Sequence, residues 1–205
     1  MKVIKPSFVI EEGIDGEEIL RKIELRGRIC YKSEDRITPD SARTLVKNLI
    51  KRGHESVLEH EKVTVTIICD RGVTHEIVRH RIGSYSQEST RYCNYSGEGI
   101  TVIKPFFFEN DTAKLQHWAK AMLACENAYN DLIGLGAGPQ EARSVLPNSL
   151  KTEIVVTYDL REWRHFFKLR TAKAAHPQMR EITIPMLAEF KKLIPVVFDD
   201  ITVEE

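Results

Sequence analysis

The sequence predicts an α+β fold: a single domain over residues 1–205 with a central, mostly antiparallel sheet flanked by helices. Runs of β-branched residues alternate along the chain with stretches in which apolar residues recur at helical spacing. No repeat, linker or low-complexity segment divides the 205 residues. Because 42% of them are hydrophobic, the chain can bury one full core.

The composition argues against several classes of protein. The 30 basic and 30 acidic residues balance, so the chain lacks the broad basic face of a nucleic-acid-binding protein. No apolar run reaches the roughly twenty residues that span a bilayer, and residues 1–6 lack the apolar core of a signal peptide. We therefore expect a cytoplasmic protein with no membrane partner. Without a C-x-x-C pair we expect neither a zinc site nor a disulfide framework from the four cysteines, Cys30, Cys69, Cys93 and Cys125.

The first quarter of the chain predicts one strand and two helices. Residues 3–10 read as a short strand and residues 16–30 as a helix with one apolar side. We expect a second helix to begin with Thr38 as its cap and Pro39 in its first position, where the missing N–H costs nothing. Apolar residues then recur at intervals of three and four until Gly53 ends the helix.

The next segment predicts a strand, a helix and a loop. Residues 62–69 alternate valine and isoleucine with threonine, which is typical of a half-buried strand. Residues 73–81 predict a helix that starts with a mostly apolar stretch. Gly83 and the serine-rich run after it favour an irregular loop at the end of this helix.

The C-terminal half alternates strands and helices. Strands are expected at residues 100–103 and 154–157, where β-branched residues are concentrated. Asp111 opens the longest helix, and Pro139 starts a short one after a glycine-rich turn. Asp159 and Glu162 form a capping-box pattern at the start of another helix. Residues 177–193 predict a final helix, with a bend at Pro185.

Residues 79–91 carry the most distinctive chemistry of the chain. They hold three arginines and one histidine among small or amide hydrogen-bonding residues. Arginine suits a planar anion because its N–H donors meet a phosphate or a carbonyl pair two at a time. The stretch therefore predicts an anion-binding loop, while a solvated helix face is the structural alternative.

The spacing within this stretch is also that of a known signature. Arg79-His80-Arg81, seven residues, then Ser89-Thr90-Arg91 resembles the motif of the flavin-dependent thymidylate synthases, the thymidylate synthase complementing protein family. Three further blocks are similar to that family: Gly53-His54-Glu55 through Glu59-His60, Ala142-Arg143 with Leu146-Pro147, and residues 159–176.

The resemblance implies an activity and an assembly. It implies a methyltransferase that forms dTMP from dUMP, with 5,10-methylenetetrahydrofolate as the carbon donor and FAD, reduced by NADPH, as the source of hydride. It also implies a homotetramer with sites shared between subunits. The resemblance implies that Arg170 is the catalytic residue and stabilises the anionic pyrimidine ring. None of the four cysteines has an activating base nearby, which agrees with a family that forms no cysteine adduct.

The resemblance further implies two sets of binding residues. Glu76 stands where the family often has glutamine, and its carboxylate would repel a phosphate, so its contact with the nucleotide is in question. The FAD set is Ser56, Arg79, His80, Arg81, Gln87, Asp159, Arg161 and His165. The dUMP set is Glu76, Arg79, Gln87, Glu88, Ser89, Thr90, Arg91, Arg143 and Arg170.

Two side chains keep alternative interpretations. Arg170 continues an apolar helical stripe, so either its guanidinium enters a pocket or its stem lies along the surface with the charge in water. His80 stands between two arginines, which disfavours its protonation. It is either a ligand-positioning group or a satisfied core histidine.

Metal sites and other functions receive less support. His54 and His60 lack a third ligand of matched spacing. His75 and His80 are five residues apart, so they diverge on a helix, and we predict no metal. A non-catalytic nucleotide- or phosphate-binding module that uses the Arg79–Arg91 loop is the alternative function. A phosphoryl-transfer enzyme is disfavoured because no aspartate cluster for magnesium accompanies the arginines.

Overall fold

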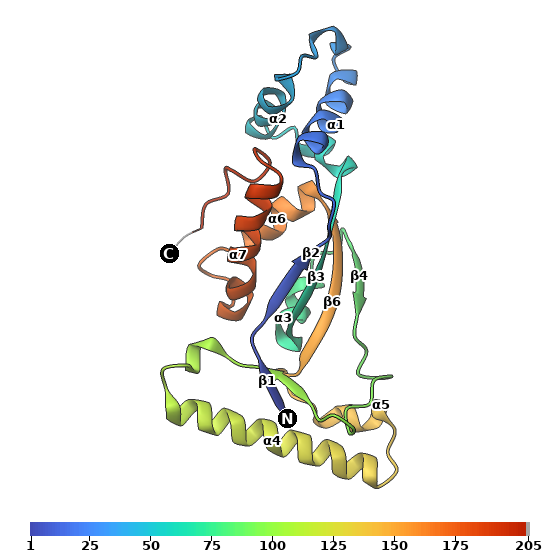
Figure 1. The fold of residues 1–205 in the computed structure, drawn as a ribbon, viewed down its shortest axis with the longest axis vertical. Coiled ribbons are helices and arrows are strands. Elements are labelled where there is room, and N and C mark those ends of the chain that lie inside the picture. Colours follow the sequence, from blue (N-terminus) through green and yellow to red (C-terminus); the bar gives the residue numbers. More distant parts are fainter. Residues whose placement is uncertain (204–205) are drawn as a thin grey trace. The chain divides into compact units, whose positions relative to one another are not determined.

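A computed structural model of the protein describes residues 1–203, and its strands form two sheets. The larger sheet has the strand order β2-β3-β6-β4, and the smaller pairs β1 with β5 in parallel, with Lys2 opposite Thr101 (Figure 1). The strands are β1 Lys2–Ile4, β2 Ser7–Ile10, β3 Lys62–Asp70, β4 Ser84–Gln87, β5 Thr101–Ile103 and β6 Lys151–Asp159. The α-helices are α1 Gly16–Ile29, α2 Ser41–Lys51, α3 Arg71–Ile77, α4 Thr112–Gly134, α5 Pro139–Ala142, α6 Leu160–Arg170 and α7 Pro177–Leu193. The 3-10 helices are η1 Glu34–Arg36, η2 Glu55–His60, η3 Phe106–Phe108 and η4 Arg143–Val145.

The larger sheet is mostly antiparallel, as predicted. At one end of the β3–β6 pair the Leu160 N–H donates to the Glu61 carbonyl at 3.0 Å. At the other end the Arg71 N–H donates to the Leu150 carbonyl at 3.1 Å, so residue numbers rise on one strand as they fall on the other. The hydroxyls of Thr64 and Thr157 meet across the pair at 2.9 Å, a cross-strand contact typical of paired threonines.

The strand predicted at residues 3–10 is in fact two strands. β1 and β2 belong to different sheets, and Pro6 lies between them. Because proline has no N–H to donate, it interrupts strand pairing at this point.

The start of the second helix also differs from the prediction. α2 begins at Ser41, and Asp40 is its N-cap residue. Thr38 and Pro39 instead belong to a turn in which the Ser41 N–H donates to the Thr38 carbonyl at 3.2 Å. Proline at the second position of such a turn is as favourable as at the start of a helix, so the sequence pattern alone does not separate the two.

The structure of residues 70–87 differs from the prediction in two ways. α3 starts earlier than predicted because Asp70 accepts the Val73 N–H at 2.8 Å and caps the helix. It ends at Ile77, so the Arg-His-Arg triplet follows the helix. Residues 84–87, predicted as loop, form the edge strand β4, and next to it the Glu88 N–H donates to the Glu153 carbonyl of β6 at 2.9 Å. An edge strand needs pairing on one side only and accepts a serine-rich sequence.

The contacts of the chain fall into two compact units. The first unit is Met1–Phe8, Thr66–Arg79 and Tyr85–Val155. Its buried cluster is apolar and combines residues of β5 and α4 with the residues just before β5 and β6. Trp118 packs beside it and donates to the Ser149 hydroxyl at 3.1 Å. The buried members are Ile100, Val102, Met122 and Leu150.

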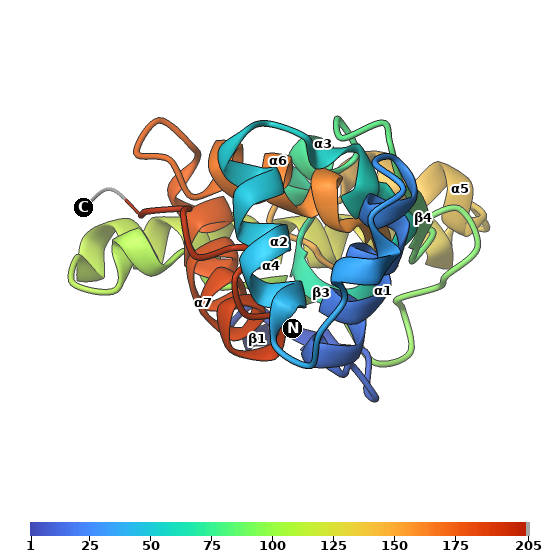
Figure 2. The ribbon, with the colours of Figure 1, turned by 90° about the horizontal axis from the view of Figure 1, so that it is seen from above.

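The second unit is Val9–Val65, His80–Ser84 and Val156–Glu205. Within it α1 and α2 lie side by side (Figure 2). Its core is aromatic: Trp163 of α6 stacks on Phe167 with ring centroids 5.6 Å apart, and Phe190 of α7 lies 4.9 Å from Trp163. The Trp163 indole N–H donates to the Val63 carbonyl at 3.0 Å, so this buried donor is satisfied. The expectation of one domain over residues 1–205 stays a prediction, and residues 204–205 lie outside the described part of the chain.

Candidate active site

The Arg-His-Arg segment lies between α3 and β4. Its outer members, Arg79 and Arg81, are exposed, while the side chain between them is buried. Gly83 follows where the backbone approaches Tyr158 so closely that an added Cβ would collide with the ring. Glycine is therefore required here for close packing.

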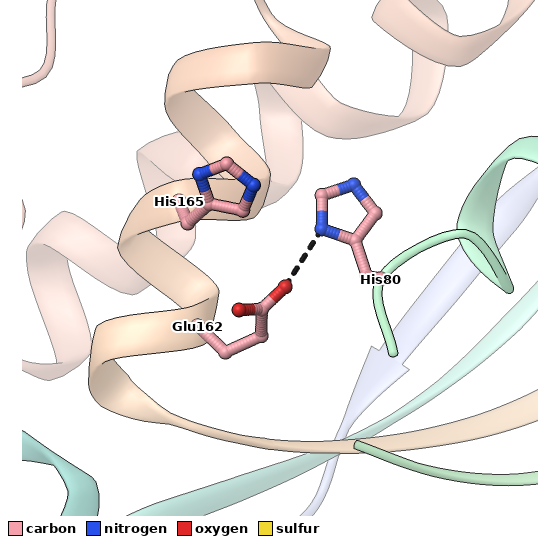
Figure 3. Close-up of side chains that lie close together, drawn as sticks. All are labelled: His80, Glu162 and His165. Carbon is pink, nitrogen blue, oxygen red and sulfur yellow. Dashed lines mark hydrogen bonds and ion pairs between the residues drawn. The ribbon is translucent and has the colours of Figure 1, made fainter. Parts of the chain in front are cut away.

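The central residue of the segment, His80, connects two charged side chains. It is 4% exposed, and its Nδ1 lies 2.8 Å from Glu162 Oε1 (Figure 3). On the other side the Arg170 Nε–H donates to His80 Nε2 at 3.1 Å. Because arginine only donates, Nε2 must accept, and the ring proton is therefore on Nδ1, where it is donated to Glu162.

The surroundings of His80 favour its neutral form. Burial lowers the pKa of His80, the Glu162 carboxylate raises it, and the Arg170 guanidinium lowers it, so that the pKa falls below its ordinary value. The predicted direction is thus confirmed, but its cause is burial and Arg170, since the neighbouring Arg79 and Arg81 point to the exterior.

Arg170 is the last residue of α6 and is anchored through both its side chain and its backbone. The apolar stripe that it continues is buried at Trp163 and Phe167, while Arg170 itself is half-buried. Its carbonyl accepts the Thr183 hydroxyl from α7 at 2.9 Å. Of the two alternatives for Arg170, the structure therefore favours a guanidinium directed to a defined partner inside the protein.

The same cluster has the composition of a metal site but not its chemistry. His80, Glu162 and His165 place ligand atoms within 4.8 Å of one another, and Figure 3 shows the two α6 side chains directed toward His80. However, both ring nitrogens of His80 already have hydrogen-bond partners, and one of them is a cation. A guanidinium at this position opposes a metal ion, so we assign none.

Gln87 and Glu88 are engaged within the first unit. The Gln87 amide nitrogen donates to Thr74 at 3.0 Å and to Thr152 at 3.2 Å. Glu88 accepts from the Tyr95 hydroxyl at 2.7 Å and from Lys151 Nζ at 2.8 Å. These bonds hold the end of β4 in place, and contacts of Gln87 and Glu88 with ligands stay a prediction.

Burial lowers the pKa of Lys151, but its bond to the Glu88 carboxylate raises it, and the pKa ends above its usual value. Lys151 therefore stays charged beside Glu88.

Ser89 and Arg91 form a turn that is tied to the segment containing Arg143. The Ser89 carbonyl accepts the Cys93 N–H at 2.9 Å, while its hydroxyl accepts the Arg91 N–H at 3.3 Å. Arg91 Nε donates to Gln140 of α5 at 3.2 Å, three residues before Arg143. Both guanidiniums are exposed, so the first unit presents two cations on connected segments.

The predicted FAD residues of the second unit lie on packed elements. Ser56 is in η2, and Arg161 and His165 are in α6, which packs against η2. Arg161 pairs with Glu59 at 2.5 Å in an exposed ion pair. Asp159 accepts the Glu162 N–H at 2.8 Å and so caps α6, as predicted.

Glu162 is the site residue that sequence reasoning missed. The capping-box pattern assigned its side chain to the start of α6, yet only its N–H takes part in the cap, and its carboxylate binds His80. The available signal was His80 itself, since a buried histidine beside a motif arginine needs an acceptor for its N–H.

Comparison with known proteins identifies the family. Residues 15–196 match the family described as thymidylate synthase complementing protein. The chain belongs to this family. The predicted resemblance and the prediction of an enzyme are thereby confirmed.

Two curated relatives in this family cover most of the chain. The flavin-dependent thymidylate synthase of Geobacter sulfurreducens is 35% identical over 185 residues, which cover 87% of this chain and 80% of that protein. The flavin-dependent thymidylate synthase of Pyrococcus furiosus is 37% identical over 169 residues, covering 81% of this chain and 69% of its own length.

A solved structure shares the fold of this family member. The crystal structure of the UMP/dUMP methylase PolB from Streptomyces cacaoi, bound with 5-Br dUMP, superposes with a TM-score of 0.83 at 21% identity. The superposition covers 97% of this chain and 96% of that one. None of the helices within residues 1–203 combines the length and the apolar character needed to cross a bilayer.

Proposed function

We propose that this family member converts dUMP to dTMP, with 5,10-methylenetetrahydrofolate as the carbon donor and with FAD that is reduced by NADPH. Family membership supports the proposal, and the observation that carries it is the guanidinium of Arg170, held at the end of α6 by a neutral histidine. We further propose a cytoplasmic homotetramer whose sites are shared between subunits.

The second unit offers groups that suit FAD. The cofactor carries two linked phosphates, which exposed guanidiniums and hydroxyls bind well. Arg81, Arg161 and Ser56 are exposed. The pair between Arg161 and Glu59 is exposed on both sides, so it contributes little and can be exchanged for a phosphate. The proposed FAD set is Ser56, Arg79, His80, Arg81, Gln87, Asp159, Arg161 and His165.

The first unit offers groups that suit the nucleotide phosphate. Arg91 is oriented by Gln140, and the Ser89 hydroxyl lies beside the backbone N–H of Arg91. We place the dUMP phosphate at Ser89 and Arg91, with Ser89 as a hydrogen-bond donor. The proposed dUMP set is Glu76, Arg79, Gln87, Glu88, Ser89, Thr90, Arg91, Arg143 and Arg170.

The chain's own contribution to the chemistry is to make C5 of the pyrimidine nucleophilic. A cysteine that adds to C6 is one route, but no activating motif accompanies any of the four cysteines in the sequence. Cys69 is also buried, and burial raises the pKa of its thiol strongly, which keeps this thiol protonated. Arg170 instead stabilises the anionic ring by donating to a ring oxygen, as a fixed donor stabilises any developing oxyanion. When bound, reduced FAD supplies the hydride that completes the methyl group.

Replacement of Arg170 by alanine tests this assignment. We expect Arg170→Ala to lower thymidylate formation by about 10²–10³-fold, the usual loss for one oxyanion-stabilising donor, while NADPH still reduces the flavin. Lys168→Ala is the matched control, because Lys168 lies on the same helix, is exposed and has only a 3.9 Å contact with Glu55. It should retain both activities.

Two results would overturn the proposal. Methyl transfer at the wild-type rate in Arg170→Ala would remove this residue from the mechanism. A colourless preparation of the wild-type protein that ignores added FAD would favour the alternative, a non-catalytic nucleotide-binding module built on the Arg79–Arg91 loop.

A further inference from the structure

We infer that Glu162 is a positioning residue for this reaction: by accepting the His80 Nδ1–H it fixes the ring tautomer whose Nε2 holds Arg170. The inference rests on the proposed function, in which Arg170 acts on the substrate. Glu162 touches neither substrate nor cofactor in that proposal and acts by orienting Arg170. The three side chains form one line of hydrogen bonds, with distances of 2.8 and 3.1 Å.

The line depends on the location of one proton. With the proton on Nδ1, the ring donates to Glu162 and accepts from Arg170. With the proton on Nε2, an N–H of the ring would face the Nε–H of Arg170, and two donors repel. A doubly protonated ring would have the same fault and would add a positive charge beside the guanidinium. The hydrogen bond from Arg170 Nε to His80 therefore forms only when His80 is neutral and carries its proton on Nδ1.

Glu162 is placed to select this state. Its carboxylate can only accept, so it favours a proton on the nearer nitrogen. Glu162 is 8% exposed and His80 is 4% exposed, so water competes little for either group. The Glu162 backbone is itself fixed, since its N–H donates to the Asp159 cap of α6.

The other groups around His80 do not replace Glu162. His165 and Phe166 face the ring from α6 with centroids at 5.3 and 5.0 Å, and Tyr158 faces it from β6 at 6.1 Å. The charged and titratable groups facing His80 thus include Glu162, Arg170, His165 and Tyr158. Of these, Glu162 alone is an anion that bonds the ring.

Glu162→Gln keeps the size of the side chain and removes its charge. Glutamine can also donate to Nδ1 and so admit the wrong tautomer. We expect kcat for thymidylate formation to fall by about 10–100-fold, as for other residues that orient a catalytic group. Reduction of the flavin by NADPH should remain.

The pH profile separates positioning from a general loss of structure. In the wild type, activity should fall on the acid side when His80 takes up a second proton. Burial lowers the pKa of His80 and the Glu162 carboxylate raises it, so removal of this carboxylate should lower the pKa further. The acid limb of the kcat profile should therefore move to lower pH in Glu162→Gln, although the maximal kcat of this variant is lower than that of the wild type.

Glu126→Gln is the matched control. Glu126 is also a helical carboxylate with 7% exposure, and it accepts the Ile100 N–H at 3.0 Å and pairs with the N-terminal amino group at 2.8 Å. Its neutralisation should destabilise the first unit without moving the acid limb of kcat.

Nitrogen-15 NMR of the histidine rings gives a second readout in the wild-type protein. We expect His80 to carry its proton on Nδ1 at neutral pH. A proton on Nε2, or an unchanged acid limb and kcat in Glu162→Gln, would overturn the inference. If the wild type makes no thymidylate but His80 shows the Nδ1–H form, the proposed function fails while the hydrogen-bonded line stands, so the two failures are distinguishable.

Discussion

Arg164 permits a quantitative prediction about the stability of the second unit. This residue of α6 is 1% exposed, and its guanidinium binds two carboxylates and one carbonyl. It donates to Glu55 at 3.1 and 3.2 Å, to the two oxygens of Asp200 at 2.6 and 2.8 Å, and to the Val197 carbonyl. Arg164 thereby fastens the C-terminal segment to α6 and η2.

The two halves of this ion cluster should respond unequally to mutation. Neutralising the carboxylates with the double variant Glu55→Gln, Asp200→Asn leaves a buried guanidinium without a counter-charge, which costs about 3–5 kcal/mol. Asp200 makes the shorter bonds but is 48% exposed, whereas Glu55 makes longer bonds and is 19% exposed, so both carboxylates are replaced together. Arg164→Met instead leaves carboxylates that water can reach, so we expect a loss of about 1–2 kcal/mol.

Thermal and urea unfolding measure the difference. For a chain of this length, each kcal/mol shifts the midpoint by about 2–4 °C, so the double variant should melt roughly 6–20 °C below the wild type. Arg164→Met should melt roughly 2–8 °C below the wild type. An Arg164→Met variant that is as unstable as the double variant, or less stable, would refute the reasoning that the buried cation is the costly group to leave unpaired.

Two further predictions concern stability. The pKa of His80 is lowered in the folded state. The contribution of His80 to the free energy of unfolding is therefore complete above its pKa in the unfolded chain, about 6.5, and is lost as the pH falls through its pKa in the folded protein. The free energy of unfolding should therefore drop by up to about 1.4 kcal/mol per pH unit from this group, and a His80→Asn variant should lack that component in urea titrations at several pH values. Gly16→Ala should destabilise by about 1–3 kcal/mol or more, because an added Cβ would collide with the Leu193 carbonyl, which is backbone and cannot move aside. Gly97→Ala, which has open space around its Cα, should unfold at nearly the wild-type urea concentration, and equal losses in the two variants would contradict this steric account.

Local sequence patterns predicted most helices well because their signals are short-range. The sequence predicts helix starts at Asp111 and at Asp159, and each carboxylate accepts an N–H of its helix's first turn. The errors occurred where two local structures share one signal. Pro39 suits a turn as well as a helix start, and the serines before Gln87 suit an edge strand as well as a loop.

The candidate site also has a part that the sequence predicted and a part that it did not. Motif spacing pointed to His80 and Arg170, but neither spacing nor periodicity joins residues that are 90 positions apart. Glu162 was assigned to a local role because the capping box accounts for it without a tertiary partner. Its actual partner could be found only once the fold had brought α6 against the segment after α3.

α6 carries both the catalytic proposal for Arg170 and the stability prediction for Arg164. Successive residues of this helix point in different directions: Glu162 toward His80, Trp163 into the aromatic core, and Arg164 toward the C-terminal segment. A helix fixed on three sides has little freedom to rotate, so the position of Arg170 at its end is set by all of them. Disruption of the Arg164 cluster should therefore reach Arg170 through the helix, whereas replacement of Glu162 should release only the guanidinium and leave the helix in place.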